Sequence, residues 1–102
     1  MTDLAEEDLE NIGDYIAFEL KAPLIALDTV NGIREKAESL QEYPERHQLD
    51  DDEELAKRGI RRIFYRNYKI YYIVQQDTVK VVRVLHMLTD SRNRLRENFT
   101  LE

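Results

Sequence analysis

The sequence predicts an α+β fold in which an N-terminal αα-hairpin packs on a three- to four-stranded antiparallel sheet, followed by a short C-terminal helix. Residues 3–40 carry two apolar stripes at helical spacing. Residues 59–87 contain three runs of β-branched and aromatic residues separated by short polar connectors, which is typical of an antiparallel meander. A chain of 102 residues suffices for one core, so we expect a single domain over residues 1–102.

The first helix is expected to begin at a cap formed by Thr2 or Asp3. It should end near Lys21, because Pro23 disfavours helical geometry in the residue before it. The apolar stripe steps by four, three, four and four residues through Ala5, Leu9, Ile12, Ile16 and Leu20.

The second helix begins with Pro23 in its first turn, where the missing N–H is harmless, and ends at Tyr43-Pro44. Gly32 within it costs about 1 kcal/mol relative to alanine unless close packing requires a glycine. The stripe consists of Ala26, Val30, Ile33, Ala37 and Leu40.

Residues 45–58 are expected to form a solvated loop with a helical turn near residues 53–55. Five consecutive acids occupy residues 50–54, but they lack the alternating ligands and the glycine of a calcium loop. We therefore expect no metal site and no cofactor.

The three apolar runs end at Tyr65, Gln75 and Met87 and are joined by Arg66-Asn67 and by residues 76–78. Neither the second nor the third run alternates cleanly between apolar and polar residues, so both faces of the sheet centre should be at least partly covered. After Leu88, apolar Leu95 and Phe99 fall at near-helical spacing and predict the C-terminal helix.

Composition limits the class of protein. The chain has no cysteine, which excludes disulfides, and no run approaches the roughly 18 apolar residues that cross a membrane. The N-terminus lacks a basic-then-apolar signal, so we expect a cytoplasmic protein. Residues 1–58 carry 17 acids and 6 bases, whereas residues 59–102 carry 4 acids and 9 bases, which predicts acidic helices and a more basic sheet and tail.

Common catalytic motifs are missing: the sequence has no glycine-rich phosphate loop, no nucleophile elbow and no paired zinc-binding histidines. Basic groups beside aromatic rings, as found in the predicted sheet, suit RNA binding, but tyrosines that fill the sheet and arginines that snorkel from it explain the same pattern. The residues in question are Arg61, Arg62, Arg66, Lys69, Tyr71, Arg83 and His86.

His86, near the end of the third run, has two interpretations. Its imidazole could act as a general acid or base near neutral pH, or it could be half-buried and hydrogen-bonded to a backbone carbonyl. His47, in the acidic loop, has no evident role.

The order of these elements resembles the RelE/ParE superfamily of toxins from type II toxin–antitoxin modules, over residues 4–86. The resemblance implies a helical hairpin packed against an antiparallel sheet. The matching residues are Ala5, Asp8, Leu9, Ile12, Tyr15 and Ile16; Pro23 and Ala26; Leu40, Tyr43 and Pro44; Gly59 and Arg61; Tyr68, Ile70 and Tyr72; and the run Arg83-Val84-Leu85-His86.

The resemblance implies two alternative activities. RelE-like members are ribosome-dependent mRNA endonucleases (mRNA interferases). In that case Arg61, Arg62 and Lys69 would hold the phosphate, with His86 as the proton donor or acceptor. ParE-like members, also known as plasmid stabilisation proteins, inhibit growth by poisoning DNA gyrase and need no catalytic residue. The Gly-Ile-Arg-Arg run and the acidity of the chain favour the ParE-like branch. Target contacts are then expected from Arg62, Arg66, Tyr71, Arg83 and Arg92.

The resemblance also implies a cognate antitoxin protein as partner, and we expect the free toxin to be unstable or to self-associate, for example as a homodimer. A degenerate, non-toxic module that only binds an antitoxin is the third alternative. Two features depart from the family pattern. The strand that usually precedes the first helix is missing from this sequence: either the true start lies upstream of Met1, or the domain has lost an edge strand, which would leave a sheet edge open. In addition, Met87-Leu88-Thr89-Asp90 replaces the customary Arg-Asp pair after the histidine.

Overall fold

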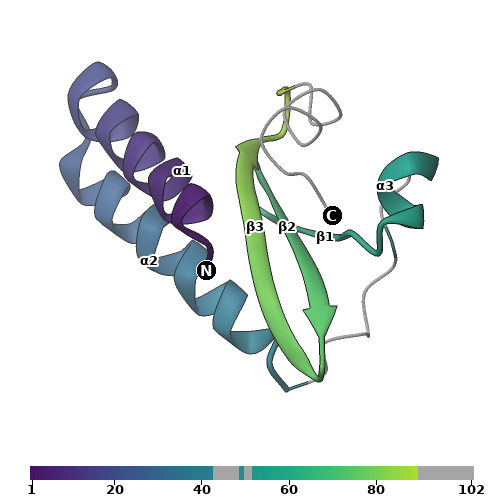
Figure 1. Ribbon diagram of the computed structural model, residues 1–102. Helices are drawn as coiled ribbons and strands as arrows, with labels where there is room; N and C mark the ends of the chain where they lie inside the picture. Colours follow the sequence, from purple (N-terminus) through teal and green to yellow (C-terminus); the bar gives the residue numbers. More distant parts are fainter. Residues whose placement is uncertain (43–48, 50–51, 90–102) are drawn as a thin grey trace.

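The structure is a computed structural model that describes residues 1–42, 49 and 52–89. Two long helices lie on one side of an antiparallel sheet, and a short helix lies on the other side (Figure 1). In the described residues the sheet has three strands in the order β1-β2-β3. The predicted α+β fold, with its αα-hairpin on the sheet, is confirmed. The expected C-terminal helix and the Tyr43-Pro44 stop lie outside the described residues.

The first helix, α1 (Asp3–Asp14), begins as expected: the Thr2 side chain accepts a hydrogen bond from the Ala5 N–H at 3.1 Å. A π-helical turn, η1 (Tyr15–Glu19), continues it, and the chain reverses at Lys21, which has a positive φ of 54°. The sequence did not predict this π-helical turn. Leu20 is therefore 57% exposed rather than part of the buried stripe.

The second helix, α2 (Pro23–Ser39), starts with Pro23 as predicted. Four of its five stripe residues are buried, and Val30 is half-buried. Gly32 is required by close packing, because a Cβ at that position would overlap the ring of Tyr65 in β1. The acidic segment forms one short helix, α3 (Glu53–Lys57), whose N-terminus is capped by the Asp52 carboxylate.

The strands β1 (Arg61–Tyr65), β2 (Tyr68–Gln75) and β3 (Thr78–His86) follow the three predicted runs. Arg66 and Asn67 form the first turn, and Gln76 and Asp77 form the second. A bulge between the pairs Tyr71↔Arg83 and Tyr72↔Val81 inserts Val82 as an extra residue in β3.

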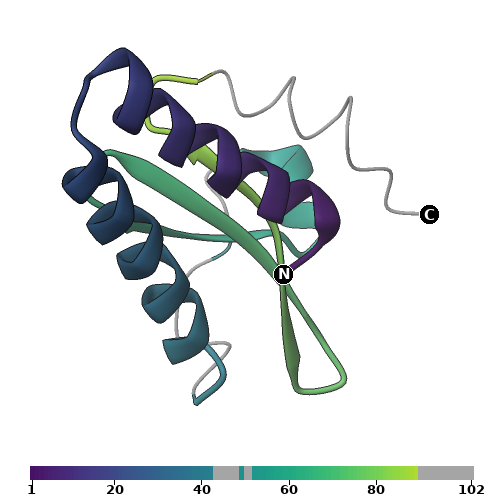
Figure 2. The same cartoon turned by 90° about the vertical axis from the view of Figure 1, so that its left-hand side faces the viewer.

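Both faces of the sheet are covered, as the sequence predicted. The face toward the hairpin holds the larger core, which includes Leu9, Ile33, Leu40, Ile70 and Tyr72. The opposite face holds a smaller cluster made of Leu55, Ile60, Tyr71, Ile73, Val82 and Leu85, which includes one side chain of α3. We call these surfaces the helix face and the far face. Figure 2 shows the hairpin lying across the sheet.

The outer edge of β3 differs from the expected open edge. Gln41 bonds to both the N–H and the carbonyl of Val79, each at 3.4 Å, and the Thr2 N–H donates to the Val81 carbonyl at 3.0 Å. The Asp8 carboxylate accepts the Val84 N–H at 3.0 Å. Thr2 and Asp8 near the start of the hairpin and Gln41 after α2 therefore bond to the edge of β3, where a neighbouring strand would otherwise pair.

Candidate functional site

The three residues that a nuclease would need do not meet at one place. Arg61 pairs with Tyr72 and His86 pairs with Tyr68, so both lie on the helix face, whereas Lys69 pairs with Leu85 on the far face. Along the strands, Arg61 and His86 are four residues apart, or about 13 Å, and two strand spacings, about 10 Å, separate them across the sheet. One phosphate cannot contact all three side chains in this arrangement.

His86 holds the end of β3. Its ring is exposed, but its Nδ1 accepts the Leu88 N–H at 3.1 Å, and the ring packs edge-on against Tyr68 at a centroid distance of 5.6 Å. His86 therefore bonds to the backbone, but it is exposed and not half-buried, and its partner is an N–H and not the expected carbonyl.

Lys69 and Tyr71 belong to the far face and are largely inaccessible. Lys69 is 9% exposed, and its Nζ donates to the Thr89 carbonyl at 3.3 Å and lies 5.8 Å from the centre of the Tyr71 ring. Tyr71 is 1% exposed. Neither side chain presents a free polar group to a macromolecule.

Among the candidate cations in the described residues, Arg83 is the most deeply buried, at 3% exposed. Its Nε and one terminal nitrogen donate to the two carboxylate oxygens of Asp8 at 2.7 and 2.8 Å. Such a two-pronged guanidinium–carboxylate pair is a strong, geometrically specific contact. It joins α1 to β3, so Arg83 organises the fold beneath the surface.

Arg62 and Arg66 are the more accessible candidates. Arg62 is half-buried and lies over the ring of Phe64, 5.0 Å from its centre, on the far face. Arg66, in the exposed first turn, donates to the Asp28 carboxylate at 2.7 Å and to the Thr29 hydroxyl at 3.3 Å. The hydrogen bond that Arg66 donates to the Asp28 carboxylate raises the pKa of Arg66 above its ordinary value. Arg92 lies outside the described residues.

The sequence analysis named Asp8 among the residues that match the family and assigned it no partner. Two signals point to its real partner. Asp8 follows Ala5 by three residues and precedes Ile12 by four, so it shares the buried side of the helix, and Arg83 interrupts an apolar run of β3. Opposite charges on two buried faces predict a pair, because an isolated buried charge is costly.

Two further properties concern cofactors and membranes. Across residues 1–42, 49 and 52–89, no cluster of three or more acidic or histidine side chains could hold a metal ion. In the same part of the chain, no helix combines the length and the apolar character that a membrane span requires.

Both a solved structure and a protein-family model resemble this chain. The chain matches the chromosomal ParDE toxin–antitoxin system from P. aeruginosa with a TM-score of 0.70 and 21% sequence identity, over 83% of this chain and 89% of the other. No curated protein matches. The family model described as ParE toxin of type II toxin-antitoxin system, parDE, matches residues 1–90. The chain therefore belongs to the ParE family, the toxins of type II toxin–antitoxin systems.

Proposed function

We propose that this ParE-family toxin arrests growth by binding DNA gyrase, and that a cognate antitoxin protein neutralises it. The observation that carries the proposal is the separation of Arg61, Lys69 and His86 over two faces of the sheet. General acid–base catalysis of RNA cleavage needs these groups within hydrogen-bonding reach of one phosphate. A toxin that acts by protein–protein contact has no such requirement.

Among the residues proposed as target contacts, Arg62 and Arg66 are the accessible ones in the described part of the chain. Tyr71 and Arg83 are buried, so we propose that they act indirectly, by holding the far face and the junction of β3 with α1. Arg66 also carries a neighbouring acid, Asp28, so a target that engages this arginine must compete with an existing ion pair.

The test is induced expression in a bacterial host without antitoxin, with the DNA-damage response and mRNA integrity scored together. Gyrase poisoning predicts filamentation and DNA damage with intact mRNA. Cut mRNA would instead support the RelE-like nuclease, and unimpaired growth with folded protein would support a non-toxic antitoxin-binding module.

Two variants sharpen this test. His86→Ala should keep most of the toxicity, because the imidazole holds a turn and no chemical step depends on it. Arg62→Ala/Arg66→Ala should lose toxicity, while Lys80→Ala, which removes an exposed cation from β3, serves as the matched control. Loss of toxicity in His86→Ala, in a protein that remains folded, would count against the gyrase proposal.

Self-association of the free toxin, including a homodimer, stays a prediction. Sedimentation velocity of the purified chain over a hundredfold range of concentration would test it. A sedimentation coefficient of a monomer throughout that range would remove the homodimer from the account.

A further inference from the structure

The turn of the helical hairpin carries an unusual concentration of exposed apolar side chains, which we call the hairpin tip. Among the described residues, eleven large hydrophobic side chains are exposed, and six of them fall within residues 15–27. These six, between 56% and 81% exposed, are Tyr15, Phe18, Leu20, Leu24, Ile25 and Leu27. Together they present on the order of 700 Å² of largely apolar surface, at or above the largest patch usual for a monomer, and such a patch marks an interaction surface.

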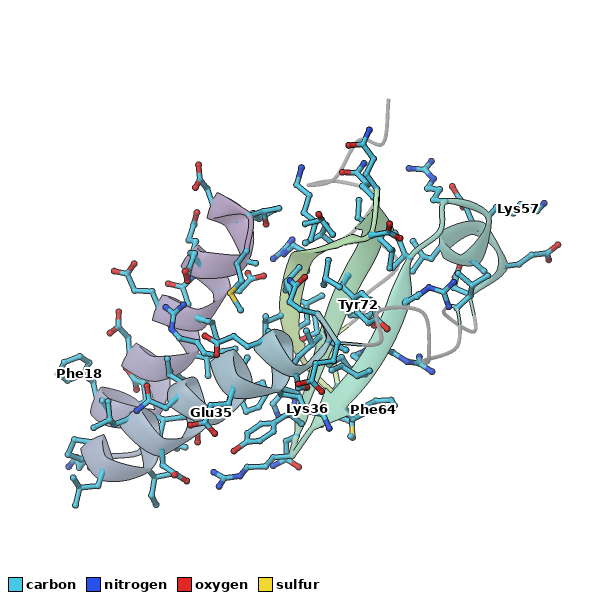
Figure 3. The ribbon with its side chains drawn as sticks, turned by 90° about the horizontal axis from the view of Figure 1, so that it is seen from below. Phe18, Glu35, Lys36, Lys57, Phe64 and Tyr72 are labelled. Atoms are coloured by element: carbon cyan, nitrogen blue, oxygen red, sulfur yellow. The ribbon has the colours of Figure 1, made fainter. Side chains whose placement is uncertain are left out.

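Backbone hydrogen bonds hold the tip in one conformation. The Leu20 N–H donates to the Tyr15 carbonyl at 3.1 Å across η1, and the Ala22 N–H donates to the Ile16 carbonyl at 3.1 Å directly after it. In Figure 3, Phe18 lies at the end of the hairpin that is remote from α3, and it points away from the sheet. A surface that is already ordered loses little conformational entropy when another molecule covers it, so the tip is prepared for association.

The tip is electrically neutral, whereas the rest of the hairpin is strongly acidic. Within residues 15–27 the charged side chains are Glu19 and Lys21, and both are exposed. The other residues of the range 1–42 carry ten acidic and two basic side chains, a balance of −8. Two hairpins laid side by side would bring these acidic stretches together and be repelled, whereas two tips can meet without that repulsion. Charge therefore selects an end-to-end arrangement for two copies of the chain.

The two charges of the tip complement each other under two-fold symmetry. In a two-fold contact, residue i of one copy meets residue j of the other, and the same pair recurs on the opposite side of the axis. Within the described part of the chain, neither Glu19 nor Lys21 takes part in an ion pair. A two-fold axis at the tip lets Lys21 of each copy face Glu19 of the other, beside the apolar side chains.

We propose that two copies of this chain associate tip to tip about a two-fold axis, with the apolar side chains of the tip at the centre of the contact. A dimer that covers most of the tip on both copies buries on the order of 1,200 Å², which reaches the size of a stable interface. The self-association expected of the free toxin thereby acquires a defined surface. The inference does not rest on gyrase as the target, because it concerns only contacts between copies of the toxin.

Sedimentation velocity of the full chain and of tip variants tests the apolar part of the contact. The wild type should pass from monomer to dimer as its concentration rises. Phe18→Ser/Leu24→Ser should weaken this association at least tenfold, because both side chains belong to the tip. Phe64→Ser, at a 49% exposed residue of β1, is the matched control and should associate like the wild type. All three residues are exposed, so the variants should keep the native circular dichroism spectrum.

Charge-reversal variants test the symmetry of the contact. Glu19→Lys and Lys21→Glu each bring like charges together across the axis and should weaken association about threefold or more, with the largest loss at low salt. The double variant Glu19→Lys/Lys21→Glu restores opposite charges and should associate like the wild type. Glu53→Lys reverses an exposed charge on α3 and serves as the control that should leave association unchanged.

An introduced cysteine identifies the surfaces that meet, because the natural sequence contains none. Leu24→Cys places a thiol at the most exposed side chain of the tip and should form a disulfide between two copies under mild oxidation. Glu53→Cys places an equally accessible thiol on α3 and should remain largely monomeric under the same conditions.

Several results would overturn the proposal. These are a chain that stays monomeric at every concentration, a dimer that Phe18→Ser/Leu24→Ser leaves intact, and a disulfide that forms through Glu53→Cys more readily than through Leu24→Cys. A monomer whose amide resonances at residues 15–27 shift with phosphatidylcholine vesicles would assign the tip to a lipid surface instead. Toxicity is measured in none of these experiments, so failure of the gyrase proposal remains distinguishable from failure of this one.

Discussion

Asp8 of α1 and Arg83 of β3, 75 residues apart in sequence, form a buried pair that also completes the edge of the sheet. Both Asp8 oxygens accept from the guanidinium, and Oδ2 also accepts the Val84 N–H at 3.0 Å. One carboxylate thereby neutralises a buried cation and satisfies an edge amide of β3. One terminal nitrogen of Arg83 is buried without a hydrogen-bond partner in the described residues, which adds to the cost of this arrangement.

Removing one member of this pair should strongly destabilise the fold. Asp8→Ala leaves Arg83 charged and buried, and we expect a loss of about 3–5 kcal/mol in the free energy of unfolding, measured by urea denaturation. Asp8→Leu/Arg83→Met replaces both charges by apolar groups and should recover much of that loss. A single variant as stable as the wild type would show that the pair does not hold α1 to the sheet.

Gly32 should tolerate no larger side chain while Tyr65 is present. The overlap of a Cβ with the Tyr65 ring predicts that Gly32→Ala destabilises the protein by about 1–3 kcal/mol, although alanine favours helices. In a Tyr65→Ser background the same change should be neutral or stabilising, by up to about 1 kcal/mol. Equal effects of Gly32→Ala in the two backgrounds would contradict the packing explanation.

Substitutions in the second turn of the sheet should increase the stability of the protein. Gln76 and Asp77 both have positive φ values, 50° and 64°, in a two-residue hairpin turn that favours asparagine followed by glycine. Gln76→Asn/Asp77→Gly is expected to raise the free energy of unfolding by about 1 kcal/mol. Thermal unfolding followed by circular dichroism measures this, and an unchanged or lower midpoint would argue against a strained turn.

Tyr68 should titrate at unusually high pH. Burial raises its pKa above the ordinary value of 10.0, and the nearby Tyr15 hydroxyl raises it further. Because the folded protein then retains a proton that the unfolded chain loses, this group leaves stability unaffected below about pH 10 and lowers it as the pH rises through the folded pKa.

Ultraviolet titration of tyrosinate absorbance, with Tyr68→Phe to assign the signal, measures this pKa. Tyr15→Phe should lower the pKa of Tyr68 while leaving it above the ordinary value, because burial is the larger cause. A Tyr68 that ionises together with fully exposed tyrosines would refute the assignment.

Much of the fold could be predicted from local patterns. The stripe of α2, Pro23 at its start and the three strand runs were sufficient for the hairpin and the meander, because apolar periodicity reports burial directly. Gly32 was expected within α2 only if close packing requires a glycine there, and the close approach of Tyr65 meets that condition. The π-helical turn was missed because Leu20 continues the helical spacing although it is exposed.

The candidate site was harder to predict, because it depends on which strand faces meet. Sequence places Arg61, Lys69 and His86 on neighbouring strands but does not reveal that Lys69 faces away from the other two. The pairing of Arg83 with Asp8, residues 75 positions apart, was also not predicted, although the spacing of both residues among buried positions indicated it. Side-chain direction and pairing register are fixed by tertiary packing. The basic composition of the strands therefore overestimated how many of their cations are accessible to a target.

Gyrase poisoning is tested most directly with purified toxin and purified DNA gyrase acting on relaxed plasmid. We expect the toxin to inhibit gyrase supercoiling or to trap cleaved DNA, His86→Ala to do so equally, and Arg62→Ala/Arg66→Ala to be at least tenfold weaker. In parallel, mRNA on translating ribosomes should remain intact. Unaffected gyrase together with cleaved mRNA would contradict the account and make the separated basic residues parts of an active site after all.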